Sequence, residues 1–123
     1  MKAAHFPGRA PLEAYGNGGF RFAGMSHRGS LLCLPSGIHE WMPQNPERLM
    51  PADLERVFAE AKGIQILLVG MGREIRAFGP ELKAGFRSAG ISADPMTTGA
   101  AVRTFNVLLA EDRAVAAALV AVD

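Results

Sequence analysis

The chain has 123 residues, and its 13 lysines and arginines against 12 aspartates and glutamates leave a formal net charge of +1. This length suits one domain, and the near-zero charge excludes a uniformly basic nucleic-acid-binding protein. A hydrophobic fraction of 49% against 20% charged residues excludes a disordered chain. No apolar run reaches the roughly 18 residues of a membrane helix, and the N-terminus lacks the apolar stretch of a signal peptide. We therefore expect a single cytoplasmic domain over residues 1–123.

The first third of the chain predicts short strands joined by tight turns. After an extended lead-in, two alternating segments flank Asn17-Gly18, a pair that favours the positive φ angles of a type I′ hairpin turn. A later segment, 30–34, is apolar on both faces, which indicates a covered strand. In chain order we expect strands at residues 12–15, 20–23, 30–34 and 38–42, and then a loop at 43–46.

From Pro51 onward the hydrophobic period changes from that of a strand to that of a helix. Apolar residues recur at i, i+3, i+4 and i+7 from Leu54 to Ala61, and Gly63 is a stop signal. By the same rules we expect helices over residues 51–61, 80–89 and about 98–111, and short strands at 64–69, 75–78 and 91–94.

The alanine-rich tail, residues 114–122, fits either a helix or a strand. Its alanines favour a helix, whereas its brevity and its apolarity on both sides suit a central strand, which we take as the prediction. Alternating strands and helices then predict an α/β fold. We expect three layers, with a mixed central sheet, an N-terminal hairpin or meander and about three helices.

Two glycine-containing segments resemble known motifs but lack essential parts of them. Gly70-Met71-Gly72 follows a strand as a dinucleotide fingerprint does, yet the third glycine is missing and the next helix starts only near Pro80. The segment 24–27 resembles a nucleophile elbow without the glycine two residues after its serine. We therefore expect no cofactor and no catalytic triad at either segment.

The single cysteine excludes an intramolecular disulfide and a multi-thiolate zinc site. Cys33 lies in an apolar strand and lacks ligand spacing to His5, His27 or His39, so we expect a buried structural thiol and no metal. Trp41 is expected to be a core or interface aromatic residue.

The segment 94–106 is the most informative part of the chain, because it joins a strand to a helix N-terminus through Thr-Thr-Gly. Backbone N–H groups at such a terminus can hold an anion, and Gly99 permits close approach. In the alternative interpretation, Thr97 or Thr98 only caps the helix, and Arg103 ties down a loop or a carboxylate. Val107, beside Arg103, suggests that this helix face is also covered, by the N-terminal sheet or by a partner. The candidate ligand or interaction residues are Thr97, Thr98, Gly99, Arg103 and Asn106, with Gly70 and Gly72 at the preceding strand end.

The segment 94–111 also resembles the signature of a family of small domains of unknown function. This family includes mitochondrial respiratory complex I assembly factor three and an adipogenesis-associated domain protein. Residues 15–22, residues 67–72 and Trp41 resemble its other landmarks, so the resemblance covers nearly the whole chain. It implies a three-layer α/β fold with a mixed sheet, a role in complex assembly and no established catalytic residue. Where the family commonly carries tyrosine, this chain has Phe105, which lacks the hydroxyl.

Two functions from different classes follow from these observations. The first is a non-enzymatic protein-interaction or complex-assembly factor, because the chain shows no acid–base or nucleophile constellation and the resemblance implies assembly. It would take a protein partner, bind no nucleic acid and not be an integral membrane protein. The alternative is a small-molecule or anion-binding domain, enzymatic or not, with its pocket at the helix start near Thr98.

Overall fold

The computed structural model describes residues 6–43, 45 and 48–123. Its α-helices are α1 (Glu55–Ala59), α2 (Pro80–Ala89) and α3 (Thr98–Ala110), and α1 is flanked by 3-10 turns at Pro51–Leu54 and Ala61–Gly63. Its strands are β1 (Phe6–Pro7), β2 (Leu12–Gly16), β3 (Gly19–Phe22), β4 (Met25–Arg28), β5 (Ser30–Leu34), β6 (Gly37–Trp41), β7 (Ile66–Gly70), β8 (Ser92–Met96) and β9 (Val115–Leu119).

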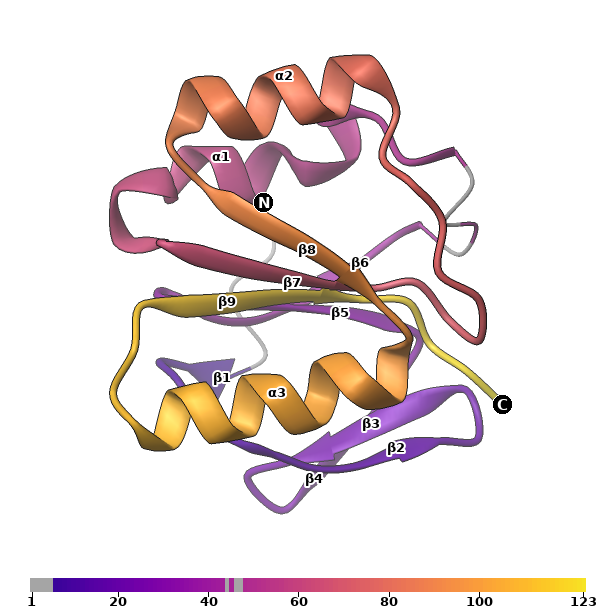
Figure 1. Cartoon of the computed structure of the whole chain (residues 1–123). Coiled ribbons are helices and arrows are strands. Elements are labelled where there is room, and N and C mark those ends of the chain that lie inside the picture. The colour runs from indigo at the N-terminus through magenta and orange to yellow at the C-terminus, as the bar shows by residue number, and fades with distance from the viewer. Residues whose placement is uncertain (1–5, 44, 46–47) are drawn as a thin grey trace.

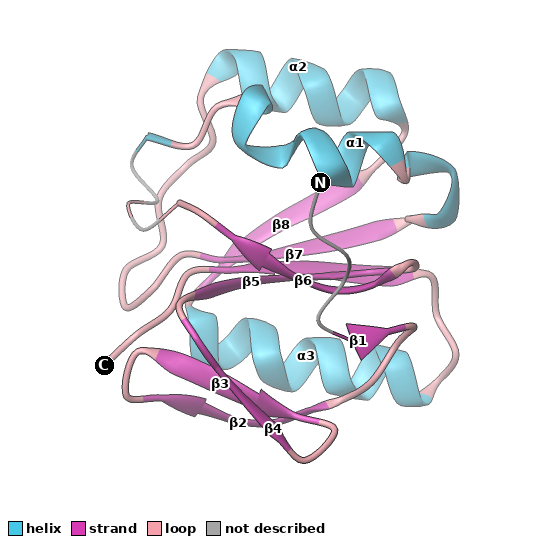
Figure 2. Cartoon of the chain, turned by 180° about the vertical axis from the view of Figure 1, so that it is seen from behind, coloured by secondary structure: helices cyan, strands magenta, loops and turns pink. Residues whose placement is uncertain are grey.

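A six-stranded sheet in the order β1-β6-β5-β9-β7-β8 forms the middle layer of the molecule. Strand β7 runs parallel to both β8 and β9, and the remaining pairs are antiparallel, so the sheet is mixed. Helices α1 and α2 cover one face (Figure 1), and α3 and the separate antiparallel sheet β2-β3-β4 cover the other (Figure 2). The predicted three-layer α/β fold with a mixed central sheet is confirmed.

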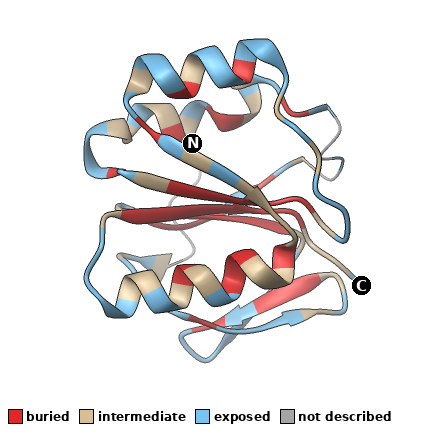
Figure 3. Cartoon of the chain, in the orientation of Figure 1, coloured by how far each residue is buried: buried red, intermediate tan, exposed pale blue. Residues whose placement is uncertain are grey.

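Apolar side chains from the central strands fill a core on each side of the sheet. Figure 3 shows these central strands coloured as buried. Because side chains alternate along a strand, Ala116 and Ala118 of β9 face the α1/α2 side and Ala117 faces the α3 side. All five residues of β9 are buried. The predicted central strand in the alanine-rich tail is confirmed, since β9 lies between β5 and β7. Its small side chains let the layers on both faces approach the sheet closely.

Two tight turns shape the three-stranded sheet. Asn17 (φ 53°) and Gly18 (φ 77°) form the predicted turn between β2 and β3. A second turn at Ala23 (φ 51°) and Gly24 (φ 74°) leads into β4, which the sequence did not predict as a strand. Alanine rarely adopts positive φ, so the sequence gives little warning of this turn. In β4, Ser26 and His27 point to opposite faces, as expected for adjacent strand residues.

Two predictions for the middle of the chain are wrong. The expected continuous helix over 51–61 is broken, because Leu54 (φ −117°, ψ 25°) and Glu60 (φ −109°, ψ 18°) leave helical geometry and divide it into two 3-10 turns around the short α1. The expected strand at 75–78 is irregular. The place beside β7 is taken by β8, so this segment does not pair with β7. Its Arg76 N–H donates instead to the Met71 sulfur, at 3.3 Å.

The predicted bounds of the two longer helices are confirmed. Pro80 starts α2, and Gly90, at φ 73°, ends it in the left-handed conformation. Helix α3 follows Thr97 as predicted and ends at Ala110. No helix in the described part of the chain is both long enough and apolar enough to cross a membrane.

Candidate functional site

The carboxyl ends of β7, β8 and β9 meet at one edge of the central sheet, where α3 begins. Strand β7 lies between its two parallel neighbours, and the helices that connect them, α2 and α3, lie on opposite faces. The strand ends are joined by backbone hydrogen bonds from Met71 N–H to Met96 O and from Val120 N–H to Gly70 O, both 2.8 Å. In open α/β sheets a strand order that reverses in this way marks the usual place for a ligand.

Thr98 connects the three strand ends. Its side-chain hydroxyl donates to Val120 O at 2.7 Å and accepts from Gly72 N–H at 2.9 Å, while its own N–H donates to Gly72 O at 2.9 Å. The residue is 0% exposed. The hydroxyl that the sequence nominated for ligand binding is therefore engaged inside the protein.

Gly70 and Gly72 have separate conformational roles beside Thr98. A Cβ added at Gly70 would lie 2.9 Å from Leu119 Cδ2 and 3.0 Å from Thr98 Cα, so only glycine lets α3 begin this close to β7. Gly72 has φ 85°, which turns the chain away from the strand. The two glycines therefore pack against the start of α3, while the next helix in the chain begins at Pro80.

Thr97 and Gly99 flank Thr98 at the start of α3. The Thr97 hydroxyl accepts from Ala100 N–H at 3.3 Å, so the predicted helix cap is confirmed. The ring of Tyr15 lies over Gly99, where an added Cβ would be 2.9 Å from its Cζ. The sequence analysis missed Tyr15, which comes to this site from β2, 84 residues earlier in the chain.

The structure does not bring Arg103 and Asn106 into this cluster. The Asn106 side chain donates to Leu12 O and accepts from Leu12 N–H, both at 2.8 Å, and thereby binds β2 to α3. Arg103 is exposed, and its side chain forms no hydrogen bond or ion pair with any described residue. The other five candidate residues therefore meet at the sheet edge. The Arg103 side chain is exposed, and the Asn106 side chain holds β2 against α3.

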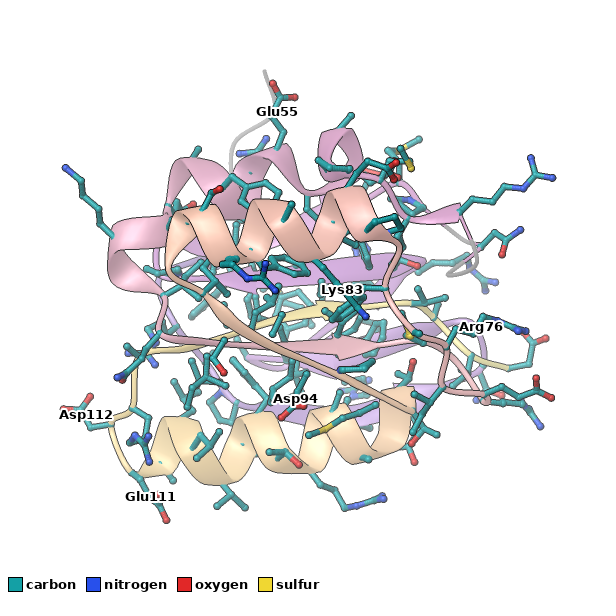
Figure 4. All side chains as sticks on the ribbon, turned by 45° about the horizontal axis from the view of Figure 1, so that its top comes forward. Glu55, Arg76, Lys83, Asp94, Glu111 and Asp112 are labelled. Carbon is teal, nitrogen blue, oxygen red and sulfur yellow. The ribbon has the colours of Figure 1, made fainter. Side chains whose placement is uncertain are left out.

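The outward face of α3 carries almost no charge. Among the 13 residues of α3, Arg103 is the only charged one, whereas α2 presents Glu81, Lys83 and Arg87. Val107 is 57% exposed, so the N-terminal sheet does not cover it. Figure 4 shows Lys83 on α2 and places the acidic residues Glu111 and Asp112 beyond the end of α3.

A hollow of about 390 Å³ adjoins the sheet edge, between the loop after β7 and the chain's last residues. In this hollow the Arg73 side chain donates to the main-chain oxygen of Asp123 at 3.0 Å, and Arg76 pairs with Glu74 at 3.5 Å. The sequence analysis did not nominate either arginine. Arg73 directly follows Gly72 and Arg76 comes four residues after it, and this position after a strand end is the signal that could have found them.

Cys33 is 3% exposed within β5, and burial raises the pKa of its thiol well above the ordinary value. The predicted buried thiol is confirmed. His5 lies outside the described residues, which contain no group of three or more metal-ligating side chains. Trp41 is buried and donates from its indole N–H to Asp53 O at 2.7 Å, which confirms it as a core aromatic residue.

We expect Cys33 to resist thiol reagents in the folded protein. The thiolate is the reactive form, and a raised pKa leaves little thiolate at neutral pH, so reactivity increases only as the pH rises toward that pKa. Reaction with Ellman's reagent at pH 7 should be at least about 100-fold slower than in denaturant. Equal rates with and without denaturant would contradict the burial of this side chain.

Comparison with known proteins finds bacterial and vertebrate relatives of this chain. An uncharacterized protein from Rhodobacter capsulatus is 39% identical over 93% of this chain and 86% of its own length. The mouse protein named NADH dehydrogenase [ubiquinone] 1 alpha subcomplex assembly factor 3 is 26% identical over 95% of this chain, which spans 63% of that relative. The frog relative of the same name, from Xenopus tropicalis, is 28% identical over 89% of this chain and 60% of its own length.

Two solved structures share the fold closely. A structure described as an outer membrane protein from Bartonella henselae is 57% identical, with a TM-score of 0.93 over 97% of this chain and all of that one. A protein from Rhodopseudomonas palustris is 44% identical, with a TM-score of 0.85 over 99% of this chain and 90% of that one. The family model described as "Protein of unknown function (DUF498/DUF598)" matches residues 12–120. The chain therefore belongs to this DUF498/DUF598 family.

Proposed function

We propose that this chain is a non-enzymatic interaction domain that helps a protein complex to assemble. Its similarity to assembly factor 3 of NADH dehydrogenase extends over 95% of the chain, which supports a role of the same class. The outward face of α3 is the structural observation that carries the proposal. A helix that covers a core normally keeps charged residues on its solvent side, and a helix that is apolar all round is normally buried.

The exposed residues of α3 define the chemistry of the partner surface. Val107 and Ala110 are exposed, and Ala100 and Leu108 are half-buried, so a partner could pack closely against the helix backbone. Arg103 supplies one positive charge without an internal partner among the described residues. We propose that the partner presents an apolar surface with an acidic group opposite Arg103.

Anion or small-molecule binding at the start of α3 stays a prediction. Two amides at this terminus are already engaged, Thr98 N–H by Gly72 O and Ala100 N–H by the Thr97 hydroxyl. Tyr15 lies over the next position, Gly99. These contacts leave fewer donors for an anion than an open helix terminus offers, so the interaction role is the function that we propose.

Replacing Val107 with glutamate should strongly weaken partner binding without unfolding the protein. The side chain is 57% exposed and glutamate is a good helix former, so we expect the stability to change by less than about 0.5 kcal/mol. A charge placed within an apolar interface should weaken binding at least about tenfold. Quantitative affinity purification from the cells that express the chain measures this loss.

The matched control is Ala84→Glu, which adds the same charge to an exposed position on the already charged α2. A defined protein should be recovered with the unmodified chain and with Ala84→Glu, and lost with Val107→Glu. Two results would reject the proposal: no protein above the background of an unrelated tagged domain, or equal recovery with both variants.

A further inference from the structure

The sheet β2-β3-β4 turns one face into the core and the other outward. On the inward face Phe20 lies opposite His27, and both Phe20 and Phe22 are buried. On the outward face Arg21 lies opposite Ser26, and Arg28 lies opposite Gly19. These outward residues line a hollow of about 370 Å³ together with Ala14 and Gly16 of β2, whose small size keeps its floor low on that side.

Among the described residues, neither arginine of this hollow forms an ion pair. The Arg21 guanidinium donates to Ser26 Oγ at 3.1 Å, and Arg28 forms no hydrogen bond or ion pair with a described residue. The acidic residue of this sheet, Glu13, accepts from Gly24 N–H at 3.3 Å in the turn between β3 and β4. Because Arg28 ends β4 at the opposite end from that turn, Glu13 does not neutralise it.

Among the strands of the described residues, β4 is also an unpaired edge of its sheet. The two-residue turn at Ala23-Gly24 makes Phe22 and Met25 a hydrogen-bonded pair, and such pairs alternate along an antiparallel ladder. The N–H and C=O groups of Ser26 and Arg28 therefore point away from β3. An exposed edge of this kind can accept an added strand from another protein.

We propose that an extended acidic segment of a protein partner pairs with β4. Its backbone would bond to Ser26 and Arg28, and carboxylates at alternate positions would face Arg28 and Arg21. A second copy of β4 fits less well, because pairing two copies would place four arginines on one face. The inference goes beyond the proposed function, because α3 packs against β2, at the other edge of this sheet.

The test uses a blocked peptide, Thr-Glu-Val-Glu-Val-Glu-Thr, and its counterpart with lysine in place of glutamate. Titration of the glutamate peptide, followed by amide NMR, should shift the Ser26 and Arg28 signals and slow hydrogen exchange at both amides. Raising the salt concentration should weaken this binding. The lysine peptide should bind at least about tenfold more weakly, because it places like charges together.

Charge reversal at Arg28 makes the test specific. Arg28→Glu should weaken the glutamate peptide about tenfold and strengthen the lysine peptide, whereas Arg87→Glu on α2 should change neither. If Arg28→Glu disturbs folding, Arg28→Gln replaces it in the test, because glutamine removes the positive charge without reversing it. The proposal is overturned by non-saturable binding, by shifts that map outside β4, or by equal losses in the Arg28 and Arg87 variants. Val107→Glu should leave peptide binding unchanged, so failure here is distinguishable from failure of the α3 interface.

Discussion

Replacing Thr98 with valine should lower the free energy of unfolding by about 3 kcal/mol, because a buried carbonyl and a part-buried N–H lose their partner. Valine has nearly the shape of threonine but lacks the hydroxyl that donates to Val120 O and accepts from Gly72 N–H. Each unsatisfied buried group costs about 1–3 kcal/mol. Denaturant unfolding followed by the fluorescence of the single, buried tryptophan, Trp41, measures the loss.

Thr98→Ser separates the hydroxyl from the methyl group. Serine keeps both hydrogen bonds and loses one buried methyl, so we expect a cost of about 1 kcal/mol. If the valine variant is as stable as the serine variant, the hydroxyl does not hold the three strand ends together.

Replacing Gly19 with alanine should destabilise the protein by about 3 kcal/mol, because the new methyl group has no space. The added Cβ would overlap the His27 carbonyl oxygen and lie 3.1 Å from its carbon and 3.2 Å from Arg28 Cα. These atoms belong to the backbone of the paired strand β4, so the strands would have to separate. Denaturant unfolding measures the stability, and hydrogen exchange of β3 and β4 amides locates the damage.

Gly79→Ala is the matched control. At Gly79 φ is −68°, and an added Cβ would meet only the Glu81 side chain, at 3.8 Å. We expect a stability within about 0.5 kcal/mol of the unmodified protein. Equal effects of the two substitutions would show that β3 and β4 do not approach as closely as the structure has them.

Local sequence signals predicted much of the fold. Asn17-Gly18 marked a hairpin turn, and the proline and glycine at the two ends of α2 marked its bounds, because these residues determine backbone angles in their immediate surroundings. The second turn escaped notice because its first residue is Ala23, which takes a positive φ angle only through the pairing of β3 with β4. The break at Leu54 was equally hidden, since its neighbours keep a helical pattern.

The candidate site could be predicted only as separate pieces. Gly70, Gly72 and Thr98 were nominated individually, but the hydrogen bonds between Gly72 and Thr98 and the packing of Gly70 against Thr98 join segments that are distant in sequence. The same holds for Asn106, whose polar side chain suggested a ligand contact and in fact pairs with Leu12, 94 residues away. Polar residue types indicate hydrogen bonding, whereas the choice of partner depends on tertiary structure.

The proposed interaction role of α3 is tested most directly by site-specific photo-crosslinking. A photoreactive side chain replaces Val107 in one variant and Ala84 in another, both exposed positions on long helices. After irradiation in the cells that express the chain, we expect one defined protein to be crosslinked at position 107 and not at position 84. The same set of crosslinked proteins at both positions, or none at position 107, would contradict an interface on α3.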